Sequence, residues 1–285
     1  MRTEHRIRAK LLDRMVRVSE GLLGRRLLNR LGAFLYWRTR GENLDDPDRN
    51  GEYRTLEVVM HQLSQASSVA FDVGANIGDW SESFLRKNPA GKVYAFEPVA
   101  ATYAHVTRRF HGQARIEICQ AAVSDKSGSC VIRVEGKLSG SNSLYRMPDE
   151  KGASLETVRA ITGDEYAAAR GIKDIDYLKI DVEGHEVRAL QGFRQLLGER
   201  RIRFIQWEYN KTWIPAGASL HDLFELLVPS GYRLCKIRPK GLLCYQHYSR
   251  SLDNYCYSNW LAICDRDYEQ MRGLLHIDEN TAHDW

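Results

Sequence analysis

The most regular feature of the chain is an alternation, from about residue 56 onward, between short apolar runs and longer amphipathic stretches. Short apolar runs predict buried β-strands, and stretches with apolar residues at helical spacing predict α-helices. The predicted strands are Val69–Val73, Val93–Phe96, Ile116–Cys119, Tyr177–Asp181, Ile202–Trp207, Tyr232–Ile237 and a last one near Leu261–Cys264. The predicted helices include Asp79–Arg86, Ala100–Phe110, Glu186–Leu197 and Leu220–Val228. This order predicts an α/β fold, a mostly parallel sheet with helices on both faces.

One internal segment breaks this rhythm. The stretch SGSCVIRVEGKLSGSNSL, residues 127–144, is rich in glycine and serine and has no helical spacing. It predicts an inserted hairpin followed by a loop, in place of a crossover helix.

The first 40 residues form a basic arm. Apolar residues recur there at helical spacing, first over 7–22 and then, after Gly24, over 27–35. Eleven Lys/Arg against three Asp/Glu give this segment a charge of +8, so the total of +4 leaves −4 for the remaining residues. Amphipathic helices of this kind lie on anionic membrane surfaces, or pack on the main domain or on a second subunit. Both interpretations are open.

The domain boundaries follow from these patterns. The polar segment 41–53 contains Pro47 and Gly51 and indicates a linker. We therefore expect a helical arm with its linker over 1–50, the main domain over 51–268, and a polar C-terminal tail over 269–285.

The composition bounds the cellular setting. Six cysteines occur without a C-x-x-C pair, so we expect reduced core residues and a cytoplasmic protein, with peripheral contact to the inner membrane surface as an alternative. No apolar run approaches the ~20 residues that span a bilayer. The mildly acidic body argues against a nucleic-acid partner, because phosphate contacts need clustered Lys/Arg.

The first predicted strand runs into an unusual turn, FDVGANIGDW. The glycines at 74 and 78 allow tight turning and close approach to a ligand. The spacing is D-x-G-x-x-x-G, which is neither the dinucleotide fingerprint G-x-G-x-x-G nor a P-loop. A carboxylate at Asp72 disfavours a pyrophosphate and favours a ligand with ammonium and sulfonium charges. S-adenosylmethionine is such a ligand.

The second strand ends in VYAFEP, which places Glu97 at its carboxyl end. A carboxylate has two oxygens that accept hydrogen bonds from the neighbouring hydroxyls of a ribose. NAD sites use the same device, so this residue supports the cofactor assignment only together with Asp72.

These motifs, with AAVSDKSG, GSNSL and DYLKIDVEGHEVRALQG in the same order, resemble the FkbM-type methyltransferases over roughly residues 69–265. The resemblance implies a class I Rossmann-like sheet with seven strands and methyl transfer from S-adenosylmethionine to hydroxyls of sugars or natural products. It also implies the cofactor contacts. The methionine part would be contacted by Asp72, Gly74, Asn76 and Gly78, and the ribose by Glu97. The adenine would lie near Ala121, Ala122 and Asp125. One departure is Gly163, where the family usually has leucine, so we expect one looser packing contact.

Methylation of a hydroxyl needs a group that takes its proton. The strand YLKID delivers Asp181 to the same sheet edge as Asp72, His185 follows in the next turn, and the fifth strand brings Glu208 alongside. We expect His185 or Asp181 to be the base, since histidine titrates near neutral pH. Asp181, Glu208 and His185 form an alternative divalent-metal cluster, which we do not favour. Glu183 is expected to cap the following helix.

Aromatic residues after the fifth strand and before the last one are candidates for acceptor binding, although such residues are also common in cores. They are Trp207, Tyr209, Trp213, Tyr245, Tyr248, Tyr255 and Tyr257. The sequence thus predicts an S-adenosylmethionine-dependent O-methyltransferase acting on a sugar, glycan, glycolipid or natural product. The alternatives are a small-molecule N-methyltransferase, a non-catalytic scaffold that keeps the sheet, and an NAD-dependent oxidoreductase.

Overall fold

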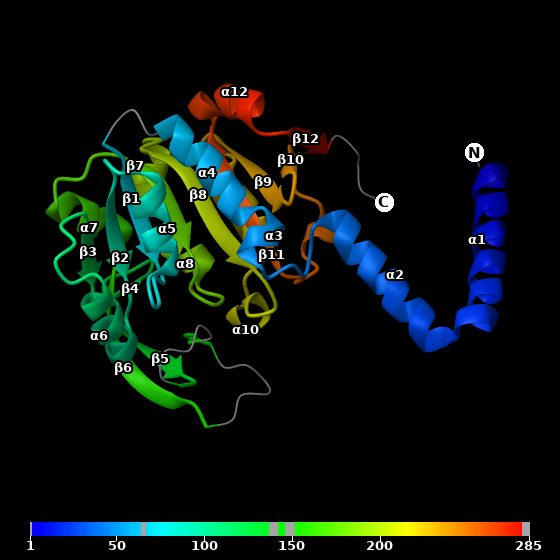
Figure 1. The fold of residues 1–285 in the computed structure, drawn as a ribbon, viewed down its shortest axis with the longest axis horizontal. Helices are drawn as coiled ribbons and strands as arrows, with labels where there is room; N and C mark the ends of the chain where they lie inside the picture. The colour runs from blue at the N-terminus through cyan, green and yellow to red at the C-terminus, as the bar shows by residue number, and fades with distance from the viewer. Residues whose placement is uncertain (1, 64–66, 137–141, 146–151, 281–285) are drawn as a thin grey trace. The chain divides into compact units, whose positions relative to one another are not determined.

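The computed structural model describes residues 2–63, 67–136, 142–145 and 152–280. The chain forms two compact units, residues 1–43 and residues 44–285. The first unit is the basic arm, with helices α1 (Arg2–Leu23) and α2 (Arg25–Arg40). The second unit, called the body below, contains the sheet (Figure 1).

The main sheet of the body has nine strands among the described residues, in the order β12-β10-β9-β11-β8-β7-β1-β2-β3. Its strands are β1 Val69–Val73, β2 Lys92–Phe96, β3 Ile116–Cys119, β7 Ile175–Ile180, β8 Ile202–Tyr209, β9 Tyr232–Arg238, β10 Gly241–Tyr245, β11 Ser258–Cys264 and β12 Ile277–Asn280. Strands β3, β2, β1, β7 and β8 are mutually parallel. The α/β prediction is confirmed, and β10 and β12 add two strands that the sequence did not indicate.

The strand order reverses beside β1, because the chain first adds β2 and β3 on one side and then β7 and β8 on the other. Ligands of open α/β sheets bind at such a point, beyond the carboxyl ends of the strands. The fold therefore predicts a site at the ends of β1, β2 and β7.

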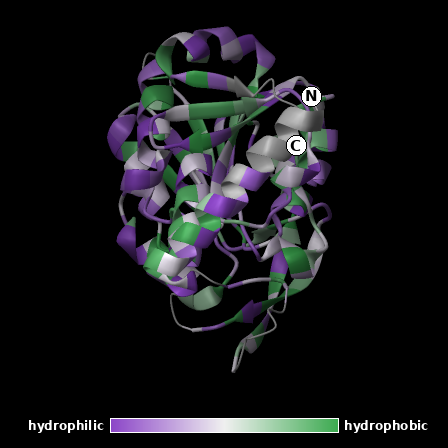
Figure 2. Cartoon of the chain, turned by 90° about the vertical axis from the view of Figure 1, so that its right-hand side faces the viewer, coloured by the Kyte–Doolittle hydropathy of each residue, from purple (hydrophilic) through white to green (hydrophobic). Residues whose placement is uncertain are grey.

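Helices cover both faces of the sheet through separate apolar clusters. One cluster joins the sheet to α4 (Glu52–Leu63), α5 (Asp79–Lys87) and α12 (Asp265–Leu274). The other joins it to α7 (Gly163–Ala169), α8 (Glu186–Gln191), α9 (Arg194–Gly198) and α11 (Leu220–Leu227). Figure 2 shows hydrophilic and hydrophobic residues interspersed along the helical ribbons of the chain, as expected of helices with one buried face. The remaining helices are α3 (Pro47–Asn50), α6 (Ala100–Arg109), α10 (Trp213–Ala216) and a 3₁₀ turn at Arg250–Leu252.

The predicted helix over 186–197 is broken into α8 and α9 around Gly192. A Cβ at this glycine would lie 2.2 Å from the carbonyl oxygen of Ser124. The break thus lets two segments of backbone approach each other. Gly163 is also tightly packed, since an added Cβ would lie 2.0 Å from the ring of Phe193. The expectation of a loose contact there is wrong, because the phenyl ring fills the space.

The segment that breaks the rhythm belongs to a second, three-stranded sheet. Its strands are β4 (Ala122–Val123), β6 (Ser154–Ile161) and β5 (Gly128–Val134), in the order β4-β6-β5. Strand β5 pairs antiparallel with β6, and Arg133 bridges to Ser143. The predicted insertion is real, but its main partner is the later strand β6. Part of the predicted loop, 137–141, lies outside the described residues.

Both predicted ends of the main domain differ from the structure. The expected linker contains α3, and Gly51 packs so closely that an added Cβ would lie 2.1 Å from the carbonyl oxygen of Arg238. The division between units falls at 43/44 and not at 50/51. Residues of the expected polar tail complete α12 and form β12, which pairs in parallel with β10. Strand β12 lies at the edge of the sheet, where little apolar surface is needed. Its residues are therefore mostly polar, and their pattern did not indicate a strand.

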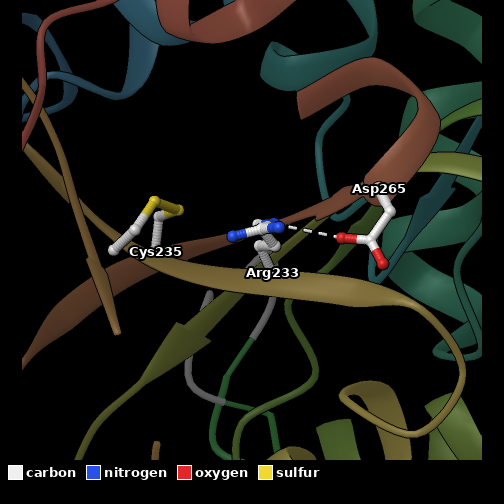
Figure 3. Close-up of a disulfide and its surroundings, with 4 residues drawn as sticks. Arg233, Cys235 and Asp265 are labelled. Atoms are coloured by element: carbon white, nitrogen blue, oxygen red, sulfur yellow. Dashed lines mark hydrogen bonds and ion pairs between the residues drawn. A yellow bond between two sulfur atoms is a disulfide. The ribbon is translucent and has the colours of Figure 1, made fainter. Parts of the chain in front are cut away.

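The cysteine prediction also needs correction. Cys235 on β9 and Cys244 on β10 are joined by a disulfide, with Cα atoms 3.8 Å apart. The antiparallel register places them directly opposite each other, a relationship that sequence spacing alone did not indicate. Figure 3 shows this disulfide on β9, with Arg233 of the same strand donating to Asp265 at 3.1 Å. Cys119, Cys130, Cys256 and Cys264 are not part of this disulfide.

In the arm, α1 ends at Gly24, which has φ 76°, and α2 ends at Gly41, which has φ 67°. Large apolar side chains along both helices are exposed, among them Met15, Leu22, Leu27, Leu31 and Phe34. Among the described residues, no helix combines the length and the apolar character needed to cross a bilayer.

Candidate active site

A hollow of about 570 Å³, partly open to solvent, lies at the carboxyl ends of β1, β2 and β7. Residues from four segments line it: the turns after these three strands, and the small sheet with the adjoining residues 142–144. They are Val73, Gly74, Asn76, Phe96, Glu97, Pro98, Ala121, Ala122, Val123, Ile132, Asn142, Leu144, Asp181, Val182, Glu183 and His185. The site therefore lies at the reversal of strand order.

The glycine turn after β1 is built by close backbone packing. Gly74 has φ 83°, and an added Cβ would lie 1.9 Å from the carbonyl oxygen of Asp181. The N–H groups of Gly74 and Ala75 both donate to the carbonyl oxygen of Phe96, at 3.0 and 2.9 Å. Only glycine fits at position 74, so this turn holds β1, β2 and β7 in register at the edge of the cavity.

Glu97 joins this turn to the end of β2. Its carboxylate accepts from the backbone N–H of Asn76 at 3.0 Å and from that of Val99 at 2.9 Å. The residue is 5% exposed, and burial raises its pKa to about 7. Beside it, Oδ1 of Asn76 is buried without a hydrogen-bond partner. A buried polar atom of this kind, at the wall of a cavity, needs a donor from a ligand or from water.

Three of the predicted cofactor residues do not line the cavity. Asp72 is buried and accepts from Oγ of Ser81 at 2.5 Å, and burial raises its pKa to about 6. Gly78 caps α5 and packs on Phe110, whose ring an added Cβ would approach to 2.5 Å. Asp125 accepts from Ser124 at 3.0 Å and pairs with Arg188 at 3.3 Å. These residues shape the site from behind its wall.

Three carboxylates meet at the ends of β7 and β8. Oxygen atoms of Asp181, Glu183 and Glu208 all lie within 4.8 Å of one another. Burial, and then Asp181, raises the pKa of Glu183 to about 7. The same two causes raise the pKa of Glu208 well above its usual range, and Nδ2 of Asn210 donates to Glu208 at 2.6 Å. Nζ of Lys179 lies 3.4 Å from Oδ2 of Asp181. The cluster is therefore partly protonated at neutral pH and has a cation beside it.

His185 lies apart from this cluster. Its Nε2 is 2.9 Å from Oγ of Ser124, and its Nδ1 is 3.0 Å from the hydroxyl of Tyr145. Burial, and then the charge of Arg188, lowers its pKa to about 4. The imidazole is thus neutral at physiological pH, with both nitrogens engaged. The alternative metal cluster of Asp181, Glu208 and His185 is therefore not formed. The residue that lies with Asp181 and Glu208 is Glu183.

The turn after β7 is held by a residue that the sequence did not single out. Glu186 accepts from the backbone N–H groups of Val182 and Gly184, both at 3.0 Å. Between them, Glu183 has φ 49°, in the left-handed region that side chains rarely adopt. The expected capping role of Glu183 is wrong. No side chain caps α8; Glu186 holds the preceding turn, and Glu183 lines the cavity.

The aromatic residues expected to bind the acceptor belong mostly to the core. Trp207, Tyr209 and Trp213 are at most 1% exposed, and the rings of Tyr209 and Trp213 meet edge to face at 5.0 Å. None of the seven lines the cavity described above. The residues that sequence analysis missed are Ser124, Tyr145 and Lys179. Only Lys179 carried a signal, since it alternates with Asp181 in YLKID.

The cavity suits a cationic methyl donor. Its lining contains Glu97, Asp181 and Glu183, and it includes no lysine or arginine. The unpaired Oδ1 of Asn76 offers an acceptor for an ammonium or a hydroxyl group. The apolar side chains of the lining, such as Phe96 and Ile132, provide a surface for an adenine ring. These features fit S-adenosylmethionine and disfavour a polyphosphate.

The sequence of the chain is similar to those of known methyltransferases. The family profile described as Methyltransferase FkbM domain matches residues 72–234, more than half of the 285 residues. Methyltransferase sdnD of Sordaria araneosa is 27% identical over 199 residues, covering 59% of this chain and 74% of that protein. Hexuronic acid methyltransferase AglP of Haloferax volcanii is 27% identical over 192 residues, covering 67% and 71%. The 2-O-methyltransferase NoeI of Sinorhizobium fredii is 27% identical over 201 residues, covering 65% and 80%.

The acidic cavity at the reversal of strand order and the match over the β1–β9 region point to the same chemistry. The chain belongs to the FkbM methyltransferase family and is an S-adenosylmethionine-dependent methyltransferase.

Proposed function

We propose that the protein transfers a methyl group to a hydroxyl of a sugar or of a glycan that contains one. Two relatives support this acceptor class, since one is named a hexuronic acid methyltransferase and the other a 2-O-methyltransferase. The observation that carries the proposal is the position of Asp181. Its carboxylate lines the cavity, has a side chain 35% exposed, and lies 3.4 Å from a buried lysine.

When bound, S-adenosylmethionine supplies a methyl group on a sulfonium, which is already a good leaving group. Asn76, through its unpaired Oδ1, and Glu97, through its carboxylate, are the residues that would hold this cofactor. The negative lining balances the cationic charge. Positioning of the two reactants by such walls contributes up to about 7–11 kcal/mol to a transfer reaction.

Asp181 is the proposed general base, which accepts the proton of the acceptor hydroxyl. The Asp181 carboxylate lies 3.4 Å from the Lys179 ammonium and lines the cavity, where an acceptor hydroxyl can reach it. Burial raises the pKa values of Glu183 and Glu208, so these two carboxyls hold a proton more readily at neutral pH. Of the two bases that the sequence suggested, the geometry favours Asp181 over His185.

The acceptor class can be tested with methyl-labelled S-adenosylmethionine. The purified protein is incubated with glucuronic acid, galacturonic acid and their neutral counterparts glucose and galactose, each as free sugar and as a lipid-linked glycoside. A labelled sugar that gains one methyl by mass spectrometry supports the proposal. Labelling of an amine in a parallel set of amino sugars, with none at any hydroxyl, would instead make the protein an N-methyltransferase.

We further propose that the basic arm holds the protein at the inner surface of an anionic membrane, where a lipid-linked acceptor lies. Exposed leucines of α2, such as Leu27 and Leu31, share the arm with a charge of +8. The guanidiniums of Arg38 and Arg40 lie 5.7 and 5.2 Å from the ring centres of Phe34 and Tyr36. Cations beside exposed aromatic rings suit the headgroup region of a bilayer.

Co-sedimentation with vesicles tests this second proposal. The full chain should bind vesicles of phosphatidylserine and phosphatidylcholine, and binding should weaken with salt and on neutral phosphatidylcholine vesicles. The L27E/L31E variant should lose most of this binding. If the variant instead loses self-association, measured by sedimentation velocity, and vesicle binding is absent throughout, the arm is a subunit interface.

A further inference from the structure

The last three residues of the motif GSNSL, Asn142, Ser143 and Leu144, lie between β5 and β6 in the chain and take part in building the cavity. Asn142 and Leu144 line it, whereas Ser143 is 3% exposed and does not. The backbone of Ser143 pairs with that of Arg133 on β5 through two hydrogen bonds, at 2.8 and 3.2 Å. The cofactor contacts proposed at the glycine turn and at the end of β2 do not involve this motif.

The hydroxyl of Ser143 fastens this segment to the turn after β7. Oγ of Ser143 donates to the carbonyl oxygen of Glu183 at 2.6 Å. It also accepts from the backbone N–H of Tyr145 at 3.1 Å. The carbonyl belongs to the residue of that turn with a left-handed backbone, φ 49°. One buried hydroxyl therefore joins the backbones of two segments 40 residues apart.

A second hydrogen bond fastens the segment at Tyr145, whose hydroxyl lies 3.0 Å from Nδ1 of His185. Oγ of Ser124 donates to Asp125 at 3.0 Å, so it accepts from Nε2 of His185 at 2.9 Å. This leaves Nδ1 of His185 as the acceptor and the hydroxyl of Tyr145 as the donor. The residues on both sides of Leu144 are therefore tied to the turn after β7 or to the first helix that follows it.

Leu144, held between these two residues, belongs to an apolar part of the cavity wall. Its side chain packs against a small cluster that contains Val99, Ala122 and Ile132, and Ala122 and Ile132 also line the cavity. The backbone N–H of Val99 donates to the Glu97 carboxylate at 2.9 Å. The apolar wall thus adjoins the carboxylate that we propose for ribose binding. Such a wall suits the flat, weakly polar base of a nucleoside.

We propose that Leu144 forms part of the adenine-binding wall of the cavity, and that Ser143 is a positioning residue that holds Leu144 there through the carbonyl oxygen of Glu183. The inference rests on the proposed placement of S-adenosylmethionine in this cavity, with its ribose at Glu97. It gives the GSNSL motif a role in cofactor binding. Ser143 does not line the cavity, so it acts through Leu144.

The first test measures the affinity of Leu144→Ala for S-adenosylhomocysteine and for 5′-methylthioadenosine, two neutral-sulfur compounds that share the adenosyl half. Both affinities should fall by about fivefold to twentyfold, because both ligands lose the same apolar contact. Leu144→Val is the milder variant and should lower both by about twofold to fivefold. Leu155→Ala is the matched control, since Leu155 on β6 of the same small sheet is 63% exposed and does not line the cavity.

The outcomes separate the adenine from the rest of the ligand. An equal loss for both compounds supports a contact with the adenosyl half. A loss for S-adenosylhomocysteine alone would place Leu144 at the amino-acid part, and unchanged affinities in a folded Leu144→Ala protein would remove it from the cofactor site. Either of these two results would overturn the inference.

A double-mutant cycle tests the positioning role of Ser143. Ser143→Ala should lower the affinity for S-adenosylhomocysteine by about threefold to tenfold, through loss of one fixing hydrogen bond. In the Leu144→Ala background the same change should matter by less than about twofold, because the side chain that Ser143 holds is already gone. A general loosening of the cavity would give the same loss in both backgrounds and would overturn the positioning role.

Two further serine variants complete the cycle. Ser143→Thr keeps the hydroxyl and should retain most of the affinity, although the cycle with alanine decides the question whether or not the added methyl group fits. Ser129→Ala changes an exposed serine of β5 and should leave affinity unchanged. Circular dichroism and thermal unfolding confirm that each variant is folded.

These titrations need neither an acceptor nor turnover. A protein that binds S-adenosylhomocysteine as described but methylates no sugar would refute the proposed acceptor class and leave this inference standing. Sugar methylation with full affinity for S-adenosylhomocysteine in Leu144→Ala would refute this inference alone.

Discussion

The backbone N–H of Asn76 donates to the carboxylate of Glu97 at 3.0 Å. This hydrogen bond ties the glycine turn after β1 to the end of β2, so the carboxylate that we propose for ribose binding also holds the loop that we expect to contact the methionine part. The second oxygen of Glu97 accepts from Val99. The proposed cofactor contact and the geometry of the loop therefore involve the same buried carboxyl group.

The affinity for S-adenosylmethionine should rise with pH between about 6 and 8. Burial raises the pKa of Glu97 to about 7 and that of Glu183 to about 7, and a cationic ligand favours their ionised forms. In the ligand-free protein, the stability of the fold has the opposite dependence on pH. A carboxyl whose pKa is raised on folding contributes most to stability at low pH, and this contribution is lost as the pH rises through about 7.

Calorimetric titration from pH 5.5 to 8 measures this dependence, and Glu97→Gln is the matched variant. The amide oxygen can accept from only one of the two backbone N–H groups of Asn76 and Val99, and the side chain carries no charge, so affinity should be lower and its rise with pH smaller. A pH profile as steep as that of the natural protein would show that Glu97 is not the titrating group.

Ser81→Ala should destabilise the fold by about 1–3 kcal/mol, because it leaves the buried Asp72 carboxylate without its hydroxyl donor. Oγ of Ser81 is 2.5 Å from Asp72. The control lies on the same helix, since Oγ of Ser83 is buried without a partner. Ser83→Ala gains the same helix propensity and should change stability by less than about 0.5 kcal/mol. Urea unfolding of both variants at pH 7 measures the difference, and equal effects would contradict the assigned role of Ser81.

Gly163→Leu should destabilise the protein even though the family usually has leucine there. The added side chain would meet the ring of Phe193, which an added Cβ already approaches to 2.0 Å. Overpacking of this kind costs about 1–3 kcal/mol. Gly198→Leu is the matched control, because nothing lies within 4 Å of an added Cβ at that helical position. Thermal unfolding compares the two, and Gly163→Leu/Phe193→Ala should recover part of the loss by making room.

The sequence predicted the parallel half of the sheet well, because buried strands such as Val69–Val73 are continuous apolar runs between turn residues. It missed β12, whose residues Ile277–Asn280 are mostly polar, since an edge strand needs little apolar surface. It also missed the break at Gly192, which depends on the approach of Ser124 from a distant segment. Local patterns contain no information about such approaches.

At the site, motif spacing indicated which residues gather at the sheet edge, but not which way they face. Gly74 and Glu97 line the cavity, whereas Asp72 lies behind its wall. The contacts of Glu52 with Lys179 and Gln206 join positions more than a hundred residues apart. Only the assembled sheet creates them, and so the partner of the proposed base could not be inferred from YLKID alone.

Substitutions of Asp181 and of His185 should have different effects on turnover at saturating S-adenosylmethionine. Asp181→Asn removes the proposed proton acceptor with little change in shape, so turnover should fall about 10²–10⁴-fold. Burial lowers the pKa of His185 to about 4, and both of its ring nitrogens are engaged with Ser124 and Tyr145. His185→Gln keeps a hydrogen-bonding side chain, so turnover should fall by less than about tenfold, the loss expected when a group orients the site without taking the proton. Initial rates between pH 5 and 9 measure both variants. The opposite ranking, with His185→Gln nearly inactive and Asp181→Asn active, would move the base to the imidazole.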